Sequence, residues 1–289
     1  MGRLIFGTAY EGMLRLSAID SRDIVDDLRN RHKLGYLPTV VLGRLVTASS
    51  LVIPWLSEKE VITFLISSTG PAGNVASQAN AKGKVRGYIS NTNFELEPNS
   101  LGKFDVKNAI GKGELTVVRD IGLRYPYVSK VPIISGEIAE DIAYYYTRSE
   151  QLPSAFALGV LMDKNGVVSA GGIAVQILDK NLSYSIVEKI EERLKDFSVS
   201  SMMKNNSLED IVRFVLNTDA ILFEEMNVVF GCNCSRQKAF ESLKVLDISD
   251  IYELIAEAKA EITCKWCGNQ YVFEKDELQK IFEDKRKNQ

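Results

Sequence analysis

Apolar residues in the first 178 positions recur with two spacings, one typical of strands and one typical of helices. Short runs rich in β-branched and apolar residues predict strands, and turn residues such as the Gly-Pro-Ala-Gly segment at 70–73 separate them. An apolar residue every three or four positions predicts helices within 21–52, interrupted near Gly35 and Pro38, and within 137–148. The predicted strands are 61–67, 75–79, 84–89, 114–120 and 167–175. Clustered strands with helices between them favour an α+β domain over a doubly wound one.

From residue 179 onward the pattern becomes that of helices. Apolar residues recur every three or four positions with charged residues on the other side, which predicts an amphipathic helix. Its apolar stripe consists of Leu182, Ile186, Ile190 and Leu194, and Phe197 continues it. Ser207 followed by Leu-Glu-Asp is an N-cap signal and predicts a second helix. An apolar stripe of this size must pack against another part of the protein.

The four cysteines of the chain form two closely spaced pairs. One residue separates Cys232 from Cys234, 29 residues lie between Cys234 and Cys264, and Cys264-x-x-Cys267 completes the pattern. Zinc prefers four tetrahedral sulfur or nitrogen ligands, and two such pairs supply them with little extra ordering of the chain. The only histidine, His32, is distant in sequence and has the character of an ordinary surface or boundary residue. We therefore predict one zinc ion per chain, bound by the four cysteines.

The residues next to each pair predict the local structure. Gly268 can adopt a positive φ, which lets backbone N–H groups approach the sulfurs. Ser235 is a good N-cap for a helix that continues through Leu243. The Cys-x-x-Cys motif lies between strand-like segments at 261–263 and 271–273, which predicts a hairpin. A thioredoxin-like oxidoreductase places this motif at a helix start after a strand, so the pattern argues against such an enzyme.

The distribution of the cysteines predicts a domain boundary. All four lie in the last 58 residues, and the first 231 residues contain none. A chain of 289 residues fits two domains, or one large domain with an appendage. We predict an α+β fold with an N-terminal core domain of mixed sheet and helices at 1–178, a helical linker at 179–227 and a small C-terminal zinc-binding domain at 228–289.

The charge balance and the motifs argue against several classes of function. The net charge is −3, from 35 basic and 38 acidic residues, which gives no overall attraction to nucleic acid or to anionic membranes. Residues 228–289 carry 10 Lys or Arg and 11 Asp or Glu, whereas a nucleic-acid-binding module usually has a basic face. The glycines at 70–87 lack a phosphate-loop ending, and the N-terminal part lacks a convincing nucleophile–base set. We expect no catalytic residues, no enzymatic turnover, no nucleic-acid partner and no membrane partner.

The apolar runs predict a cytoplasmic protein. The run at 156–162 ends at Asp163, whereas a bilayer span needs roughly 20 apolar residues. Arg3 and Glu11 bracket a stretch too short for the apolar part of a signal peptide. Cytoplasmic thiols are kept reduced, so clustered cysteines there are metal ligands or redox sensors rather than structural disulfides.

The predicted zinc site has two interpretations. A domain of about 60 residues has a small core, and structural zinc contributes on the order of 10–16 kcal/mol of apparent binding energy, so the fold of this domain should depend on the metal. Zinc-bound cysteines are also thiolates, the form that oxidants attack, which makes the site a redox switch. A purely structural zinc site is the alternative that the spacing leaves open.

Over essentially its whole length the chain resembles the heat shock protein 33 family, the redox-regulated holdase chaperones of bacteria. The matching segments occur in the family's order and are Gly70-Pro71, Val85-Arg86-Gly87-Tyr88, Asp120-Ile121-Gly122 with Pro126-Tyr127, Gly136-Glu137-Ile138-Ala139-Glu140-Asp141, Ser149-Glu150-Gln151-Leu152-Pro153, Ala170-Gly171-Gly172 with Gln176, and the two cysteine pairs with Ser235 and Tyr271. The resemblance implies an N-terminal α+β core, a helical linker and a C-terminal zinc domain.

The resemblance also implies a mechanism, in which the reduced, zinc-bound form is inactive. Oxidation would join Cys232 to Cys234 and Cys264 to Cys267, release zinc, unfold the zinc domain and destabilise the linker. The apolar surface exposed in this way would hold unfolding client proteins without ATP, often as a homodimer. In this sequence the matching client surface is the apolar stripe of Leu182, Ile186, Ile190 and Leu194. Permanent burial of the apolar stripe in a core is the alternative that the sequence leaves open.

Overall fold

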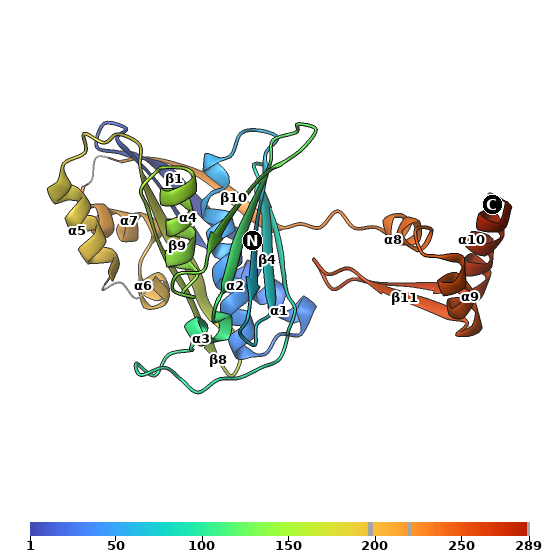
Figure 1. The fold of residues 1–289 in the computed structure, drawn as a ribbon. Coiled ribbons are helices and arrows are strands. Elements are labelled where there is room, and N and C mark those ends of the chain that lie inside the picture. Colours follow the sequence, from blue (N-terminus) through green and yellow to red (C-terminus); the bar gives the residue numbers. More distant parts are fainter. Residues whose placement is uncertain (196–198, 219–220, 288–289) are drawn as a thin grey trace. The chain divides into compact units, whose positions relative to one another are not determined.

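The computed structural model describes residues 1–195, 199–218 and 221–287. Its contacts divide the chain into two compact units, Met1–Gly231 and Cys232–Gln289 (Figure 1). The predicted boundaries differ from this division, because the described residues of 179–227 lie within the first unit. That 179–227 acts as a linker stays a prediction.

The first unit is built on one large sheet. Its described residues form ten strands in the order β7-β6-β3-β4-β5-β10-β1-β2-β9-β8. Neighbouring strands in this order are antiparallel apart from β10 and β5, which pair in parallel. The strands are β1 (Gly2–Ala9), β2 (Leu14–Asp20), β3 (Val61–Ser68), β4 (Asn74–Asn80), β5 (Lys84–Ile89), β6 (Gly113–Asp120), β7 (Tyr127–Pro132), β8 (Ser154–Asp163), β9 (Gly166–Ile177) and β10 (Leu222–Phe230).

Helices lie on both faces of the part of the sheet that contains β1, β2, β9 and β8. Successive residues of a strand point to opposite faces, and here both sets are apolar. Leu4 and Ile19 join the core around α2, whereas Ile5 and Leu16 join a second core under α5, α6 and α7. The helices of this unit are α1 (Arg22–His32), α2 (Tyr36–Leu51), the 3-10 helix η1 (Ile53–Trp55), α3 (Val106–Ile110), α4 (Ala139–Ser149), α5 (Tyr184–Lys195), α6 (Val199–Asn205) and α7 (Leu208–Leu216).

Within the described residues, Tyr36–Trp55 is the one helical stretch long and apolar enough to cross a membrane, with a mean hydropathy of 1.5. It comprises α2 and η1, and 89% of it is buried inside the protein. A helix that is apolar all round is expected when the sheet and other helices surround it. The burial therefore identifies a core helix.

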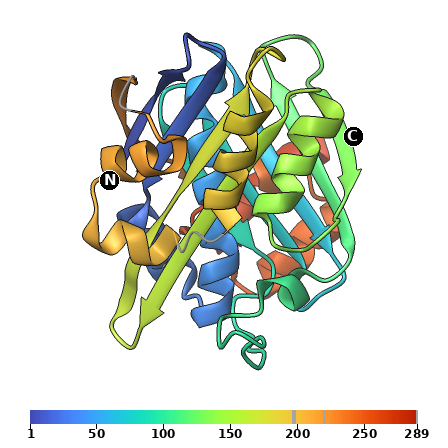
Figure 2. The ribbon, with the colours of Figure 1, turned by 90° about the vertical axis from the view of Figure 1, so that its left-hand side faces the viewer.

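The apolar stripe shares one cluster with residues of the sheet. Helix α5, which carries three of the four stripe residues, lies over the sheet (Figure 2). Leu182 and Ile190 are 7% and 4% exposed, and Ile186 and Leu194 are half-buried in the same cluster. Their neighbours in the cluster include the β9 residues Ile173 and Val175. Phe197 lies outside the described residues.

The α+β class is confirmed, and each of the five predicted strands is found within about one residue at its start and two at its end. The helices predicted within 21–52 and 137–148 are also present, as α1, α2 and α4. Residues 222–227, predicted as the end of the helical linker, instead form part of β10. Burial along β10 does not alternate cleanly, so its conformation is set by pairing with β1 and β5 rather than by its own pattern. Strands β1, β2, β7 and β8 were not predicted.

The second unit consists of helices packed on a two-stranded hairpin. Its elements are α8 (Arg236–Leu243), α9 (Ile248–Ala256), β11 (Lys259–Thr263), β12 (Gln270–Glu274) and α10 (Lys275–Lys287). Arg236 forms hydrogen bonds of 2.7 and 2.8 Å with the carboxylate of Glu277, and its guanidinium lies 4.5 Å from the centre of the Phe273 ring. The buried apolar core of the unit is small and comprises Ala239, Leu243, Ile251, Ala260, Phe273, Leu278 and Ile281.

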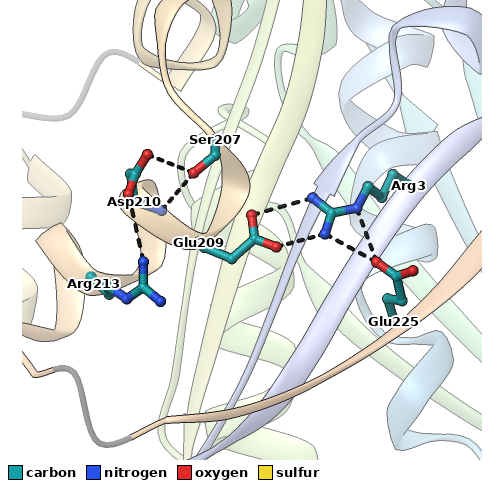
Figure 3. Close-up of polar contacts among 6 residues, drawn as sticks. All are labelled: Arg3, Ser207, Glu209, Asp210, Arg213 and Glu225. Atoms are coloured by element: carbon teal, nitrogen blue, oxygen red, sulfur yellow. Dashed lines mark hydrogen bonds and ion pairs between the residues drawn. The ribbon is translucent and has the colours of Figure 1, made fainter.

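Arg3 on β1 connects α7 to the sheet through ion pairs with two glutamates (Figure 3). Its guanidinium donates to both carboxylate oxygens of Glu209, in the first turn of α7, over 2.6 and 3.2 Å, and to Glu225 of β10 over 3.0 and 3.1 Å. As predicted, Ser207 caps α7, because its hydroxyl accepts the backbone N–H of Asp210 at 3.1 Å. The hydrogen bonds from Arg3 hold the pKa of Glu209 below its usual range. The ion pair therefore stabilises the docked helix at neutral pH, and this contribution is lost as the pH falls through the lowered pKa.

We expect the substitution Arg3→Gln to loosen α7. Partly exposed ion pairs contribute on the order of 1 kcal/mol or less, so the amides of Leu208–Leu216 should exchange with deuterium about threefold to fivefold faster. Lys130→Gln is the matched control, because it removes a 2.8 Å ion pair with Glu114 between β6 and β7. Unchanged exchange in α7 of the Arg3 variant would contradict the role given to Arg3.

Candidate metal centre

The four cysteines lie at two places in the second unit. Cys232 and Cys234 occupy the segment that begins the unit, directly before α8. As predicted, Ser235 caps this helix, and its hydroxyl accepts a backbone N–H of the first turn at 3.2 Å. Cys264 and Cys267 lie in the turn between β11 and β12, which pair as the predicted antiparallel hairpin. The first pair is therefore fixed by a helix start and the second by a hairpin turn.

Backbone hydrogen bonds fold the Cys-x-x-Cys turn tightly. The N–H groups of Cys267 and Gly268 donate to the carbonyl of Cys264 at 3.3 and 2.8 Å, and the N–H of Cys264 donates to the carbonyl of Asn269 at 2.9 Å. Gly268 has a φ of 73°, which confirms the predicted positive value. A side chain at this position would be strained, since residues other than glycine rarely adopt this conformation.

The four sulfur atoms occupy one small volume. All of them lie within 4.8 Å of one another, with 3.8 Å between the sulfurs of Cys232 and Cys264 and 3.3 Å between those of Cys234 and Cys267. Four sulfurs placed tetrahedrally at roughly 2.3 Å from a zinc ion are about 3.8 Å apart. The cysteines are thus clustered closely enough to bind a metal ion, and the donor set fits zinc.

The crowding of the sulfurs has an electrostatic consequence. Burial, together with the neighbouring cysteine sulfurs, raises the pKa of the Cys267 thiol well above its usual value. Burial also raises the pKa of Cys264. A coordinated divalent cation has the opposite effect and deprotonates the thiols that bind it. A cation at this site would therefore favour the thiolate forms of Cys264 and Cys267.

Tyr271 on β12 makes a polar contact with the cluster that the sequence pattern did not predict. Its hydroxyl donates a hydrogen bond to the sulfur of Cys234 at 3.1 Å. This contact raises the pKa of Tyr271, since it favours the protonated phenol. The residue follows Cys267 by four positions, but only the hairpin pairing places its hydroxyl beside the other cysteine pair. His32 ends α1 in the first unit and does not belong to the cluster.

The other predicted site residues lie in the first unit. Leu182, Ile186, Ile190 and Leu194 contribute to one apolar cluster, as described above, and they face the sheet. The structure therefore brings the four predicted metal ligands together and keeps the predicted client surface covered. Client binding by this surface stays a prediction.

Comparison with known proteins gives one consistent answer. The Hsp33 protein family matches residues 2–274. A 33 kDa chaperonin of Thermotoga maritima is 44% identical over 283 residues, which cover 98% of both chains. A 33 kDa chaperonin of Lactobacillus acidophilus is 38% identical over 278 residues, which cover 94% of both chains. The crystal structure of the T. maritima 33 kDa chaperonin, a heat shock protein 33 homolog, aligns with a TM-score of 0.96 at 44% identity and covers 99% of both chains.

The fold and the match along the chain define a chaperone. The chain belongs to the Hsp33 protein family, as the resemblance of its sequence segments implied.

Removing one of the four sulfur ligands should abolish metal binding by the cluster. With Cys264→Ser, three thiolates remain and the tetrahedral set is incomplete, so the metal content of the reduced protein should fall well below about one ion per chain. Elemental analysis of the purified reduced protein measures this content. Asn233→Ser is the control, because it changes a residue between two ligands and removes no sulfur. A Cys264→Ser protein with as much metal as the control would refute the four-sulfur site.

Proposed function

We propose that the protein is a redox-regulated holdase, a chaperone that binds unfolding proteins without ATP. In its reduced form the four cysteines hold one zinc ion and the protein is inactive. Oxidation converts the cysteines to disulfides, releases zinc, unfolds the second unit and exposes apolar surface. The observation that carries this proposal is the cluster of four sulfurs within 4.8 Å in a unit with a small core.

The metal would be a main source of stability for the second unit. Among the described residues of the unit, the apolar core contains seven buried side chains, two of which are alanines. Domains of this size usually need disulfides, a metal or another partner in order to fold. The cysteine cluster joins the start of the unit to the turn of the hairpin, so a bound ion would connect α8 to β11 and β12. Four sulfur ligands in a tetrahedron select zinc or an iron–sulfur cluster, and we propose zinc.

Oxidation by a peroxide would remove the ligands in pairs. A cysteine thiolate attacks one peroxide oxygen, the O–O bond breaks, hydroxide leaves and a sulfenic acid forms. The thiolate of a second cysteine attacks the sulfenic sulfur, so an S–S bond forms and a second hydroxide leaves. Two peroxide molecules thus oxidise four thiolates to two disulfides, and zinc loses all four anionic ligands.

The pairing that we propose, Cys232 with Cys234 and Cys264 with Cys267, follows the family resemblance. Two short sulfur separations, 3.8 and 3.3 Å, join residues of different pairs, and all four sulfurs lie within 4.8 Å of one another. Proximity in the reduced arrangement therefore does not select the pairing. Peptide mapping of the oxidised protein would determine it.

The client surface that we propose is the apolar stripe. Its residues share one apolar cluster with residues of β2, β8 and β9 and of α6 and α7. Release of the segment from Leu182 through α7 would therefore uncover both the stripe and apolar sheet residues such as Leu16 and Ile173. Together these surfaces could bind the apolar segments of an unfolding protein. A homodimer of the oxidised form would present two such surfaces. The reducing cytoplasm is the compartment in which the inactive form would persist.

A client-aggregation assay tests this function. Light scattering measures the aggregation of a client protein that unfolds on heating. The protein is added to the client in one of two forms, either reduced and zinc-loaded or pretreated with peroxide at elevated temperature. We expect the oxidised protein to suppress most of the scattering at an equimolar ratio and the reduced protein to suppress little of it. A sample that is oxidised and then reduced with zinc present should lose its activity again.

The other outcomes distinguish the alternatives. Equal suppression by both forms would leave a chaperone without a redox gate. Suppression by neither form would contradict the holdase proposal and favour a purely structural zinc domain with another binding function, such as nucleic-acid binding. The charge count of residues 228–289, with 10 basic and 11 acidic side chains, argues against nucleic acid.

A further inference from the structure

The sulfur of Cys234 accepts a hydrogen bond from a side chain, the hydroxyl of Tyr271. Tyr271 lies on β12 opposite Ile262 of β11, and its hydroxyl is 3.1 Å from the Cys234 sulfur. The sulfurs of Cys264 and Cys267 are approached by the backbone N–H groups of Trp266 and Asn269. The contact to Cys234 can therefore be removed by one substitution that leaves the backbone unchanged.

A hydrogen bond of this kind changes the reactivity of a metal-bound thiolate. The phenol donates its proton toward the lone pair of the sulfur, and this lone pair must attack the oxygen of a peroxide. Donors to a coordinating atom stabilise its bound, anionic form and withdraw electron density from it. Nucleophilicity of a thiolate falls as its charge is stabilised.

We propose that Tyr271 is a positioning residue that slows the oxidation of Cys234 through this hydrogen bond and thereby sets the oxidant threshold of the switch. The inference rests on the proposed redox function and adds to it a named residue outside the four ligands. The geometry supports the role, since Tyr271 is half-buried, packs against the core of the second unit and carries its hydroxyl to the sulfur.

The substitution Tyr271→Phe tests the proposal in the full-length protein. It keeps the aromatic ring in its packed position and removes the hydroxyl. A chromogenic chelator measures zinc release from the reduced protein at several peroxide concentrations. Mass spectrometry of the same samples measures the fraction of Cys234 that an alkylating agent can still modify. We expect the peroxide-dependent rate constants for zinc release and for loss of reactive Cys234 to rise about threefold to tenfold.

Tyr252→Phe is the matched control. Tyr252 lies on α9 in the same unit, is 63% exposed, and its ring centre is 6.1 Å from that of Phe282. This variant loses the same hydroxyl group at a position outside the metal cluster, so its rate constants should equal those of the wild type.

The remaining outcomes separate the inference from the proposed function. If peroxide releases zinc from the wild type and the rate constants for zinc release and Cys234 oxidation are the same in Tyr271→Phe, the role of Tyr271 is wrong but the proposed function stands. Equal acceleration of zinc loss with and without peroxide would also overturn it, because the hydroxyl would then act on stability rather than on reactivity. If peroxide releases no zinc from the wild type, the proposed function fails before Tyr271 is tested.

Discussion

Four sulfur atoms share one small volume in the second unit, and we propose that the fold of this unit depends on them. Within 4.8 Å of one another, four thiolates would repel each other strongly, and a cation among them would compensate this charge. The unit around them has few buried apolar side chains to stabilise it without that cation. Chemistry at four atoms can therefore determine whether the unit of about 58 residues is folded.

The first unit has the opposite character, with two apolar cores and a ten-stranded sheet among its described residues. None of the four cysteines belongs to this unit. The second of these cores contains the proposed client surface, and in it α5 and α7 pack with apolar strand residues. Arg3 adds a polar connection between α7, β1 and β10 (Figure 3). The proposed client surface is therefore present in this structure, where its apolar residues pack against those of the sheet.

Local signals in the sequence were sufficient for the parts that local chemistry determines. The spacing of the cysteines, the caps at Ser207 and Ser235 and the positive φ of Gly268 each depend on a few adjacent residues. The apolar stripe follows from helical periodicity alone.

Features that depend on distant pairing could not be predicted in the same way. Strand β10 takes its conformation from β1 and β5, and Arg3 meets Glu209 across 206 positions of the chain. The contact between Tyr271 and Cys234 requires the hairpin and the segment before α8 to be folded together. No periodicity or motif encodes these pairings, since they arise when the chain has already adopted its topology.

Hydrogen–deuterium exchange of the full-length protein, before and after peroxide treatment, tests most directly whether the sulfur cluster controls folding. In the reduced, zinc-loaded protein, the amides of α8, β12 and α10 should be protected. After oxidation and zinc release they should exchange at least about 100-fold faster, while β4 and β9 in the first unit keep their protection. Equal protection of the second unit in both states, with zinc lost and disulfides formed, would contradict the account.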